Sequence, residues 1–406
     1  MFQRLCIGLI VALATQIAAG QTIQAHKPSL GGHPPPSAND IANRPAPVLD
    51  ANAVIVHGPL VLAASQTSAT IEWTTNVPAT AHVEYGEHDF AQTAEANQFG
   101  QRPVGTLHRV ELTRLEPGHS YQYRLVATPV VRLKPYWPEN GRATTSAAYP
   151  LTTLPPRQAA VSFSLITDTH ESLPRISALM NSINWPSTAF LVHLGDGVDY
   201  AVDEDQVFDH WLDPLAKALN GKPLLVARGN HEWRGPFARS MTSYLTSASE
   251  NRYFYARDTG PLHLLVMDSG EDKPDATPVY AGLNLQAPYR AQELAWFREH
   301  VKNDPMLTSA PFRIVLMHQP DWGWLDGKNA EWTQVANAAG VDLVIAGHYH
   351  RFVHFNPGEA GNNFPVLVVG QDQVAHVDAS EDKLHITVTA TDGKLIDSFD
   401  VLRHSH

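Results

Sequence analysis

Cysteine is almost absent from this chain of 406 residues, in which Cys6 is the single one. It lies within residues 1–20, which have the pattern of a removable export signal, so the mature chain is expected to have neither disulfides nor thiolate chemistry. Long apolar runs are also missing: the run from Leu5 to Ala14 is shorter than the roughly 20 residues of a membrane-spanning helix. Stability must then come from core packing, with bound metal as the other available source.

Positive charge is scarce as well. The chain has 29 Lys and Arg against 41 Asp and Glu, a formal net charge of -12. This balance argues against a nucleic acid polymer as partner, because such binding draws on Lys and Arg that face phosphates. A small anionic ligand is compatible with this negative net charge, because a bound metal can supply positive charge locally. Hydrophobic residues make up 43%, which predicts a packed globular body, and the length suits two domains.

The N-terminal region has the features of an exported protein. Residues 1–20 carry Arg4 near the start and Ala18-Ala19-Gly20 as a small-residue cleavage site, so we predict a signal peptide and export to the periplasm or the medium, with no membrane anchor after cleavage. Residues 21–52 are rich in Pro, Gly, Ala and Ser and are predicted to form an extended Pro-rich linker. Packing of part of this linker on the next domain is left open.

Residues 53–155 are predicted to form a small all-β sandwich, because short runs with a period of two alternate with turn residues. The clearest of these runs, each expected to be a half-buried strand, are Thr70–Thr74, Ala81–Tyr85 and Ser120–Leu125. Trp73 on an early strand and the stretch 115–124, with Leu115-Glu116-Pro117-Gly118 before Tyr121 and Tyr123, resemble a fibronectin type III module.

Paired prolines at 155 and 156 mark the next boundary, and residues 160–406 are predicted to form an α/β domain. Apolar strand-like runs alternate there with residues at helical spacing, such as Val207, Trp211 and Leu215. The runs are Val161–Thr167, Ala189–Leu194, Pro223–Ala227, Leu262–Met267, Phe312–Met317 and Val341–Ala346. In such domains ligands collect at the carboxyl ends of the strands.

Five short polar stretches follow these strand-like runs. They are Asp168-Thr169-His170, Gly195-Asp196, Gly229-Asn230-His231-Glu232, Val315-Leu316-Met317-His318 and Gly347-His348-Tyr349-His350. Besides His231 and Glu232, they offer two carboxylates, one amide and four imidazoles, a donor set that suits a pair of divalent cations. A single Asp-x-His pair is a common accident, whereas five such stretches at one sheet edge predict a binuclear metal site.

The order of these motifs resembles the binuclear metallophosphoesterase (calcineurin-like phosphoesterase) family, and the preceding β module resembles its purple-acid-phosphatase-like branch. The resemblance implies a four-layer αββα sandwich, two divalent or mixed-valence ions of Fe, Zn or Mn, and Asp196 as a bridging ligand. It implies one ion on Asp168, His170, Asp196 and His350, and the other on Asp196, Asn230, His318 and His348.

One departure from the branch concerns the loop after the bridging carboxylate. Purple acid phosphatases place a tyrosine ligand three residues after it and a glycine two residues after the first aspartate. Here Asp199 stands at the tyrosine position, Tyr200 follows it, and His170 replaces the glycine. We expect His170 to take the place of the tyrosine, with contact between Tyr200 and metal as the alternative.

The implied reaction is attack of a metal-bridging hydroxide on phosphorus, with no protein nucleophile. His231 matches the family's non-ligand histidine, which protonates the leaving oxygen, and a purely structural histidine is the alternative. Each of the neighbouring residues has two alternative roles. Glu232 either orients His231 or caps a helix, Arg234 and Arg351 bind phosphate or form salt bridges, and Trp322 and Trp324 form an aromatic wall or pack a loop. His193 and His354 are expected to be structural.

The sequence therefore predicts an exported, metal-dependent phosphoric-ester hydrolase, foremost a phosphomonoesterase of the acid phosphatase type acting on a small phosphate ester. A phosphodiesterase or nucleotidase is the alternative on the same site. An exported binding protein with an inactive phosphatase-like domain is the alternative from another class, and the complete set of seven ligands, counted from Asp168 to His350, disfavours it.

Overall fold

The computed structural model describes residues 52–246, 252–320, 330–359 and 361–403. The predicted signal peptide, the predicted linker apart from Asn52, and the two loop tryptophans Trp322 and Trp324 lie outside these ranges. Within them, every helix is too short or too polar to cross a membrane.

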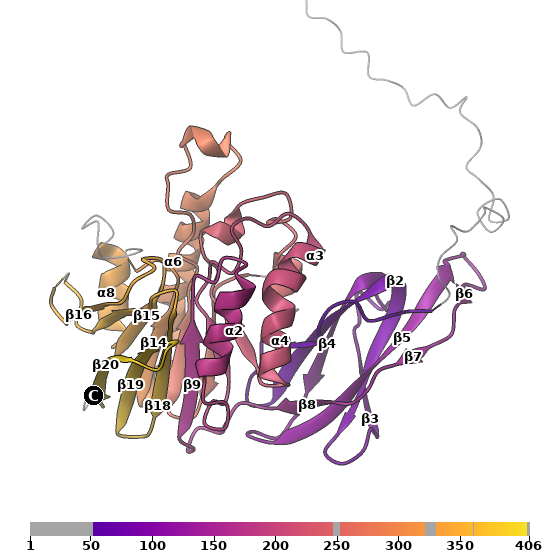
Figure 1. Ribbon diagram of the computed structural model, residues 1–406, viewed down its shortest axis with the longest axis horizontal. Coiled ribbons are helices and arrows are strands. Elements are labelled where there is room, and N and C mark those ends of the chain that lie inside the picture. The colour runs from indigo at the N-terminus through magenta and orange to yellow at the C-terminus, as the bar shows by residue number, and fades with distance from the viewer. Residues whose placement is uncertain (1–51, 247–251, 321–329, 360, 404–406) are drawn as a thin grey trace, which may run out of the picture.

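Two sheets face each other in the C-terminal part of the chain (Figure 1). In the first, neighbouring strands follow the order β20 (Leu395–Leu402), β19 (Lys383–Ala390), β18 (Gln373–Ala379), β9 (Val161–Ile166), β10 (Leu191–His193) and β11 (Leu224–Val226). In the second, the order is β12 (Tyr255–Thr259), β13 (Leu262–Val266), β14 (Phe312–Leu316), β15 (Leu343–Ala346), β17 (Val366–Val368) and β16 (Val353–Phe355). Strands are parallel within β9, β10 and β11 and within β13, β14, β15 and β17.

Helices cover the outer face of each sheet. On the first sheet lie α2 (Leu173–Ser182), α3 (Glu204–Val207), the π-helical turn η1 (Phe208–Leu212) and α4 (Asp213–Leu219). On the second lie α6 (Gln286–Asn303), α7 (Pro305–Ser309) and α8 (Ala330–Ala338). The remaining short helices are η2 (His231–Trp233), α5 (Thr242–Leu245) and η3 (Pro278–Tyr280).

Side-chain alternation along the strands divides the core into three apolar layers. On β13, Leu264 and Val266 point into the layer between the two sheets, whereas Leu265 points outward to Phe297 of α6. On the first sheet, Leu191 likewise points outward, to the layer that holds Leu179 of α2 and Leu215 of α4. Successive strand residues face opposite sides, so the central parallel strands of each sheet are buried on both faces. This arrangement confirms the expected four-layer αββα sandwich.

The N-terminal strands form the expected β-sandwich domain. They are β2 (Ser68–Gly86), β3 (Gln92–Glu95), β4 (Gly105–Thr113), β5 (Ser120–Arg132), β6 (Glu139–Asn140), β7 (Thr144–Thr145) and β8 (Tyr149–Thr152). The runs predicted as separate strands at 70–74 and 81–85 belong to the single strand β2, whose pairing with β4 shifts between Thr74 and Ala79. The prediction of half-buried strands was also wrong for the first half of β2, because residues 69–75 are all buried.

The short strand β1 (Leu60–Leu62) explains this burial. It pairs antiparallel with β2 and parallel with β11, through Leu62 and Leu224, so one continuous sheet runs through both domains. Leu60 and Leu62 pack in the same apolar layer as Phe208 and Tyr244. The second face of β2 is therefore covered by the C-terminal domain, a long-range contact that period-two patterning cannot reveal. The likeness to fibronectin type III stays a prediction.

His57 forms a polar contact between the two domains just before β1. Its Nδ1 lies 2.9 Å from Asp213 Oδ2 and its Nε2 lies 3.1 Å from Asp205 Oδ1, and its ring stacks on Phe208 with centroids 4.7 Å apart. Burial lowers the pKa of His57, but the hydrogen bonds and charges of Asp213, Asp205 and Asp209 outweigh it and raise the pKa above the ordinary value of 6.5. The protonated form of His57 therefore stabilises the contact between the two domains.

We expect His57→Ala to destabilise the protein by about 2 kcal/mol at low pH, where two charge-assisted hydrogen bonds are lost. Because the folded pKa is raised, this stabilisation is complete below about pH 6.5 and falls as the pH rises through the higher folded pKa. Urea unfolding of the wild type and the variant at about pH 5.5 and pH 8.5 measures the difference. His385→Ala removes a partly exposed histidine that also pairs with a carboxylate, Asp400, and should change little. An equal loss from His57→Ala at both pH values would refute a contribution from the charge.

Candidate metal centre

All five polar stretches lie where the sequence predicted them, immediately after parallel strands. Asp168 and His170 follow β9, Asp196 follows β10, and Asn230 and His231 follow β11. In the second sheet His318 follows β14, and His348 and His350 follow β15. Within each sheet the carboxyl ends of the parallel strands meet at one edge, and contacts such as that of Asp168 with His350 join the edges of the two sheets.

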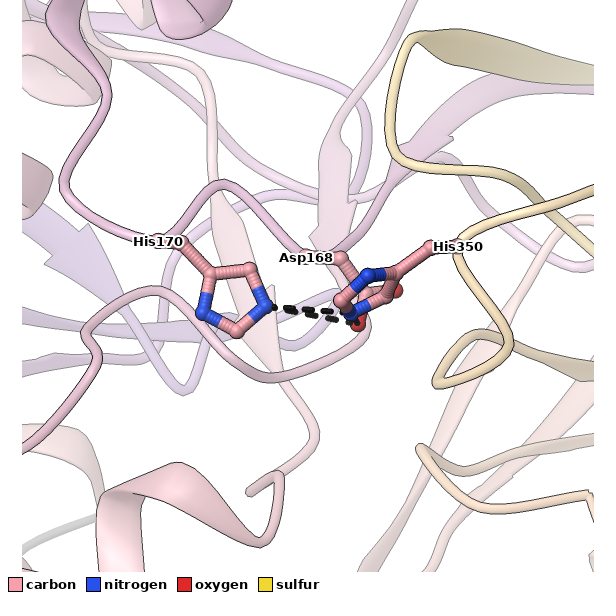
Figure 2. A group of neighbouring side chains, drawn as sticks. All are labelled: Asp168, His170 and His350. Carbon is pink, nitrogen blue, oxygen red and sulfur yellow. Dashed lines mark hydrogen bonds and ion pairs between the residues drawn. The ribbon is translucent and has the colours of Figure 1, made fainter.

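A first group of donor atoms comprises Asp168, His170 and His350, whose side chains approach one another in Figure 2. His350 Nε2 lies 3.2 Å from Asp168 Oδ1 and 3.2 Å from His170 Nε2. The other carboxylate oxygen of Asp168 accepts hydrogen bonds from the Thr167 hydroxyl (2.7 Å) and the His348 amide (3.0 Å). One oxygen is thus fixed by the protein while the other faces the two imidazoles.

A second group comprises Asp196, His318 and His348. His318 Nδ1 lies 2.7 Å from the carbonyl oxygen of Leu194 and donates to it, which aims Nε2 at Asp196 Oδ2, 3.0 Å away. A backbone carbonyl on the far nitrogen is the usual way in which proteins orient a metal-binding imidazole. Asn230 is buried in the loop that follows β11.

The site is rich in buried donor atoms that lack partners. Asp168 Oδ1, Asn230 Oδ1 and His318 Nε2 are buried and make no hydrogen bond of acceptable geometry to any described residue. Buried polar atoms are normally satisfied, so three such atoms in converging loops fit a site for cations. The residues present therefore suit the binuclear centre that the family resemblance implies.

The charges in these loops also favour a site for cations. Burial would raise the pKa of Asp196, but the charge of His318, 3.0 Å away, holds it well below its usual range. Burial would lower the pKa of His318, but Asp196 and then Asp168 raise it to about 10. Protonated His318 places positive charge beside the carboxylates of Asp196 and Asp168. Bound cations would supply positive charge at the same place.

The backbone of these loops is unusual. Asp168, His170, Asp196, His348 and His350 all have φ between 46° and 72°, the left-handed region that residues other than glycine rarely adopt. Such conformations cost free energy and cluster at functional sites. Packing is equally tight at Gly229, where a Cβ would lie 2.2 Å from Asp196 Oδ1, so any side chain there would displace this carboxylate.

Glu232 has neither of its two predicted roles. Its carboxylate is fully buried and accepts hydrogen bonds from the backbone amides of Asp196 (3.0 Å), Gly197 (2.7 Å) and Gly229 (2.7 Å). It therefore ties the loop after β10 to the loop after β11 and fixes Asp196 relative to Asn230. Burial, and then the charge of Asp196, raise the pKa of Glu232.

Asp199 lies in the site, although in the sequence it stood out only because it occupies the position of the family's tyrosine. Its Oδ1 lies 2.8 Å from His170 Nδ1, and its backbone carbonyl oxygen lies 2.7 Å from His231 Nδ1. One residue thus orients two imidazoles. Tyr200 is 56% exposed, and it is His170 that joins Asp168 and His350. The spacing of Asp199 from Asp196 was a usable signal, but its two partners are distant in sequence.

His231 is held at both ring nitrogens. Nδ1 donates to the Asp199 carbonyl, which leaves Nε2 as the acceptor for Arg234 Nη1 at 3.0 Å. Nε2 also lies 3.9 Å from Asp196 Oδ2. Arg234 in turn forms a two-pronged ion pair with Glu271, at 2.7 and 2.9 Å. Of the alternatives for Arg234, the salt bridge is the one the structure contains.

Three other predicted residues occupy simpler environments. His193 is fully buried, lies 3.1 Å from the Thr169 hydroxyl and packs against Trp211. His354 pairs with Asp397 at 2.9 Å, outside both donor groups. Arg351 is exposed in the loop beside His350.

A four-layer αββα sandwich with two donor groups at the carboxyl ends of its strands defines a metallophosphoesterase. Residues 162–352 match the calcineurin-like phosphoesterase domain, and residues 56–153 match the purple acid phosphatase N-terminal domain.

Among its relatives is acid phosphatase type 7 of Mus musculus, 25% identical over 71% of this chain and 68% of that protein. Purple acid phosphatase 18 of Arabidopsis thaliana is 23% identical over 72% and 68%. A purple acid phosphatase from yellow lupin (Lupinus luteus) seeds shares the fold, with a TM-score of 0.61, 15% identity, and coverage of 86% of this chain and 74% of that one. The chain is therefore a purple-acid-phosphatase-like phosphoesterase, of a family that uses a binuclear metal centre.

Proposed function

We propose that this protein is an exported phosphomonoesterase of the acid phosphatase type that hydrolyses a small phosphate ester. The observation that carries the proposal is the convergence of two donor groups, Asp168–His170–His350 and Asp196–His318–His348, from four loops. The names of the relatives favour a monoester over a diester. Export rests on the pattern of residues 1–20, and the absence of a nucleic acid partner rests on the net charge of -12.

The ligand assignment follows the two groups. Asp168, His170 and His350 would hold one ion, Asn230, His318 and His348 would hold the other, and Asp196 would serve both. Asp196 suits the shared position because its Oδ1 accepts the His231 amide at 3.0 Å while Oδ2 faces His318. When bound, a pair of divalent cations supplies the charge that makes water nucleophilic and neutralises phosphoryl oxygens.

His231 acts on the leaving group. The Asp199 carbonyl fixes the Nδ1 proton, so Nε2 is the atom that faces the substrate oxygen. Arg234 keeps Nε2 in place when no substrate is bound. With an ester bound, the imidazolium form of His231, protonated at both nitrogens, would pass its Nε2 proton to the departing oxygen and keep the Nδ1 proton. The Arg234–Glu271 ion pair positions the imidazole from outside the reaction centre.

Metal content and substrate preference together test this function. The purified mature protein should contain about two metal ions per chain or more and hydrolyse p-nitrophenyl phosphate faster than its bis-ester. A faster bis-ester would reassign the protein to the phosphodiesterases. Protein without metal that hydrolyses neither ester after metal is restored would refute the assignment.

A further inference from the structure

A second cluster of potential metal ligands lies away from the five loops. It consists of His263 on β13, His300 near the end of α6, and Asp304 directly after α6. His263 Nε2 lies 2.9 Å from His300 Nε2, and His300 Nε2 lies 3.3 Å from Asp304 Oδ2. Two imidazole nitrogens and one carboxylate oxygen thus point at a common position.

The outer contacts of the cluster aim these atoms. His263 Nδ1 donates a hydrogen bond to Asp258 Oδ1, 2.8 Å away. The lone pair of His263 is therefore on Nε2. The backbone amide of Met306 donates to Asp304 Oδ1 at 2.7 Å, which leaves Oδ2 for the imidazoles. A carboxylate behind a histidine, on the nitrogen that does not bind the metal, is the usual support of a metal-binding imidazole.

The environment favours a dication. His263 is fully buried, whereas His300 and Asp304 are 12% and 26% exposed, so water can reach the position from the Asp304 side. Asp258 and Asp304 contribute two negative charges, against Arg252, which stacks on Trp296 nearby.

The cluster is separate from the catalytic loops. His263 is the second residue of β13 and pairs across the hairpin with Asp258 of β12, whereas the catalytic loops follow the opposite, carboxyl ends of the parallel strands. An ion at this position would join the outer hairpin of the second sheet to the end of α6.

We propose that His263, His300 and Asp304 bind a third divalent cation, of the zinc type. Two imidazoles, one carboxylate and one water form a tetrahedral zinc site, with Zn–N distances of about 2.0–2.1 Å. Tetrahedral geometry at those distances separates the donor atoms by about 3.3 Å, so the two imidazoles need to move apart by only a few tenths of an ångström.

Crystals of the wild-type protein grown with zinc chloride give the direct test. Anomalous scattering at the zinc edge should show a peak between His263 Nε2 and His300 Nε2, in addition to any peaks at the five loops. Peaks at the loops without one at this cluster would overturn the proposal and leave a hydrogen-bonded histidine pair.

Matched variants give a second readout in solution. His300→Ala, and Asp304→Asn, which keeps the cap on α7, should each lower the zinc content after dialysis by about one ion per chain. His354→Ala is the control, because His354 also pairs with a carboxylate, Asp397, but belongs to neither donor group. Equal zinc content in all four proteins would refute the site, and the anomalous map of the wild type decides if a variant fails to fold.

Discussion

Asp196→Asn should lower kcat/KM for p-nitrophenyl phosphate by about a thousandfold or more and reduce the bound metal by at least one ion per chain. Asp196 is the carboxylate assigned to both ions, and its Oδ2 faces His318 at 3.0 Å. Removing its charge weakens both sites at once. The loss of several kcal/mol of charge stabilisation corresponds to about tenfold in rate for each 1.4 kcal/mol.

The substitution is informative because it leaves the local fold intact. Asn has the same shape, and its Oδ1 can still accept the His231 amide that Asp196 Oδ1 accepts at 3.0 Å. The backbone amide of residue 196 still donates to Glu232. A rate loss without a fall in melting temperature would therefore report the charge and not the structure.

Asp392→Asn is the matched control, since Asp392 is an exposed carboxylate in a hairpin turn whose Oδ1 accepts the Lys394 amide. Its rate and metal content should equal those of the wild type. If Asp196→Asn kept both its rate and its metal, Asp196 would not be a bridging ligand and the two-ion assignment would be wrong.

The catalytic loops were predictable from sequence because each polar stretch directly follows an apolar run. Strand β14, for example, is apolar at nearly every position and ends two residues before His318. Local order of this kind places a side chain at a strand end, and the rule for parallel sheets then brings the ends together. The helical segment from α3 to α4 was also predictable, from Val207, Trp211 and Leu215 at helical spacing.

The contacts that shape the site were not predictable, because they join residues with no local relation. Glu232 accepts the amide of Asp196, 36 residues away, and Asp199 contacts His170 across 29 residues. Nothing in the neighbourhood of Glu232 distinguishes a carboxylate that ties two loops from one that caps a helix. The pairing of β1 with β11 is similar, since it depends on Leu62 meeting Leu224.

His231→Ala should lower kcat for an alkyl phosphate by roughly a hundredfold or more and leave the metal content unchanged. The imidazole lies outside both ligand groups and is anchored through Nδ1 to the Asp199 carbonyl. Because its Nε2 lies 3.9 Å from Asp196 Oδ2, it faces the centre without being assigned to either ion. Loss of rate with retained metal is the signature of a group that acts on the substrate.

The choice of substrate separates proton transfer from a positioning role. A leaving group such as p-nitrophenolate is stable as an anion and needs little protonation, whereas an alkoxide needs a proton. His231→Ala should therefore harm the alkyl phosphate much more than p-nitrophenyl phosphate. His210→Ala removes another histidine near these loops, 3.8 Å from Glu171, and should change either rate by no more than about twofold. Equal losses for both esters in His231→Ala would assign His231 to phosphate positioning, and unchanged turnover would remove it from catalysis.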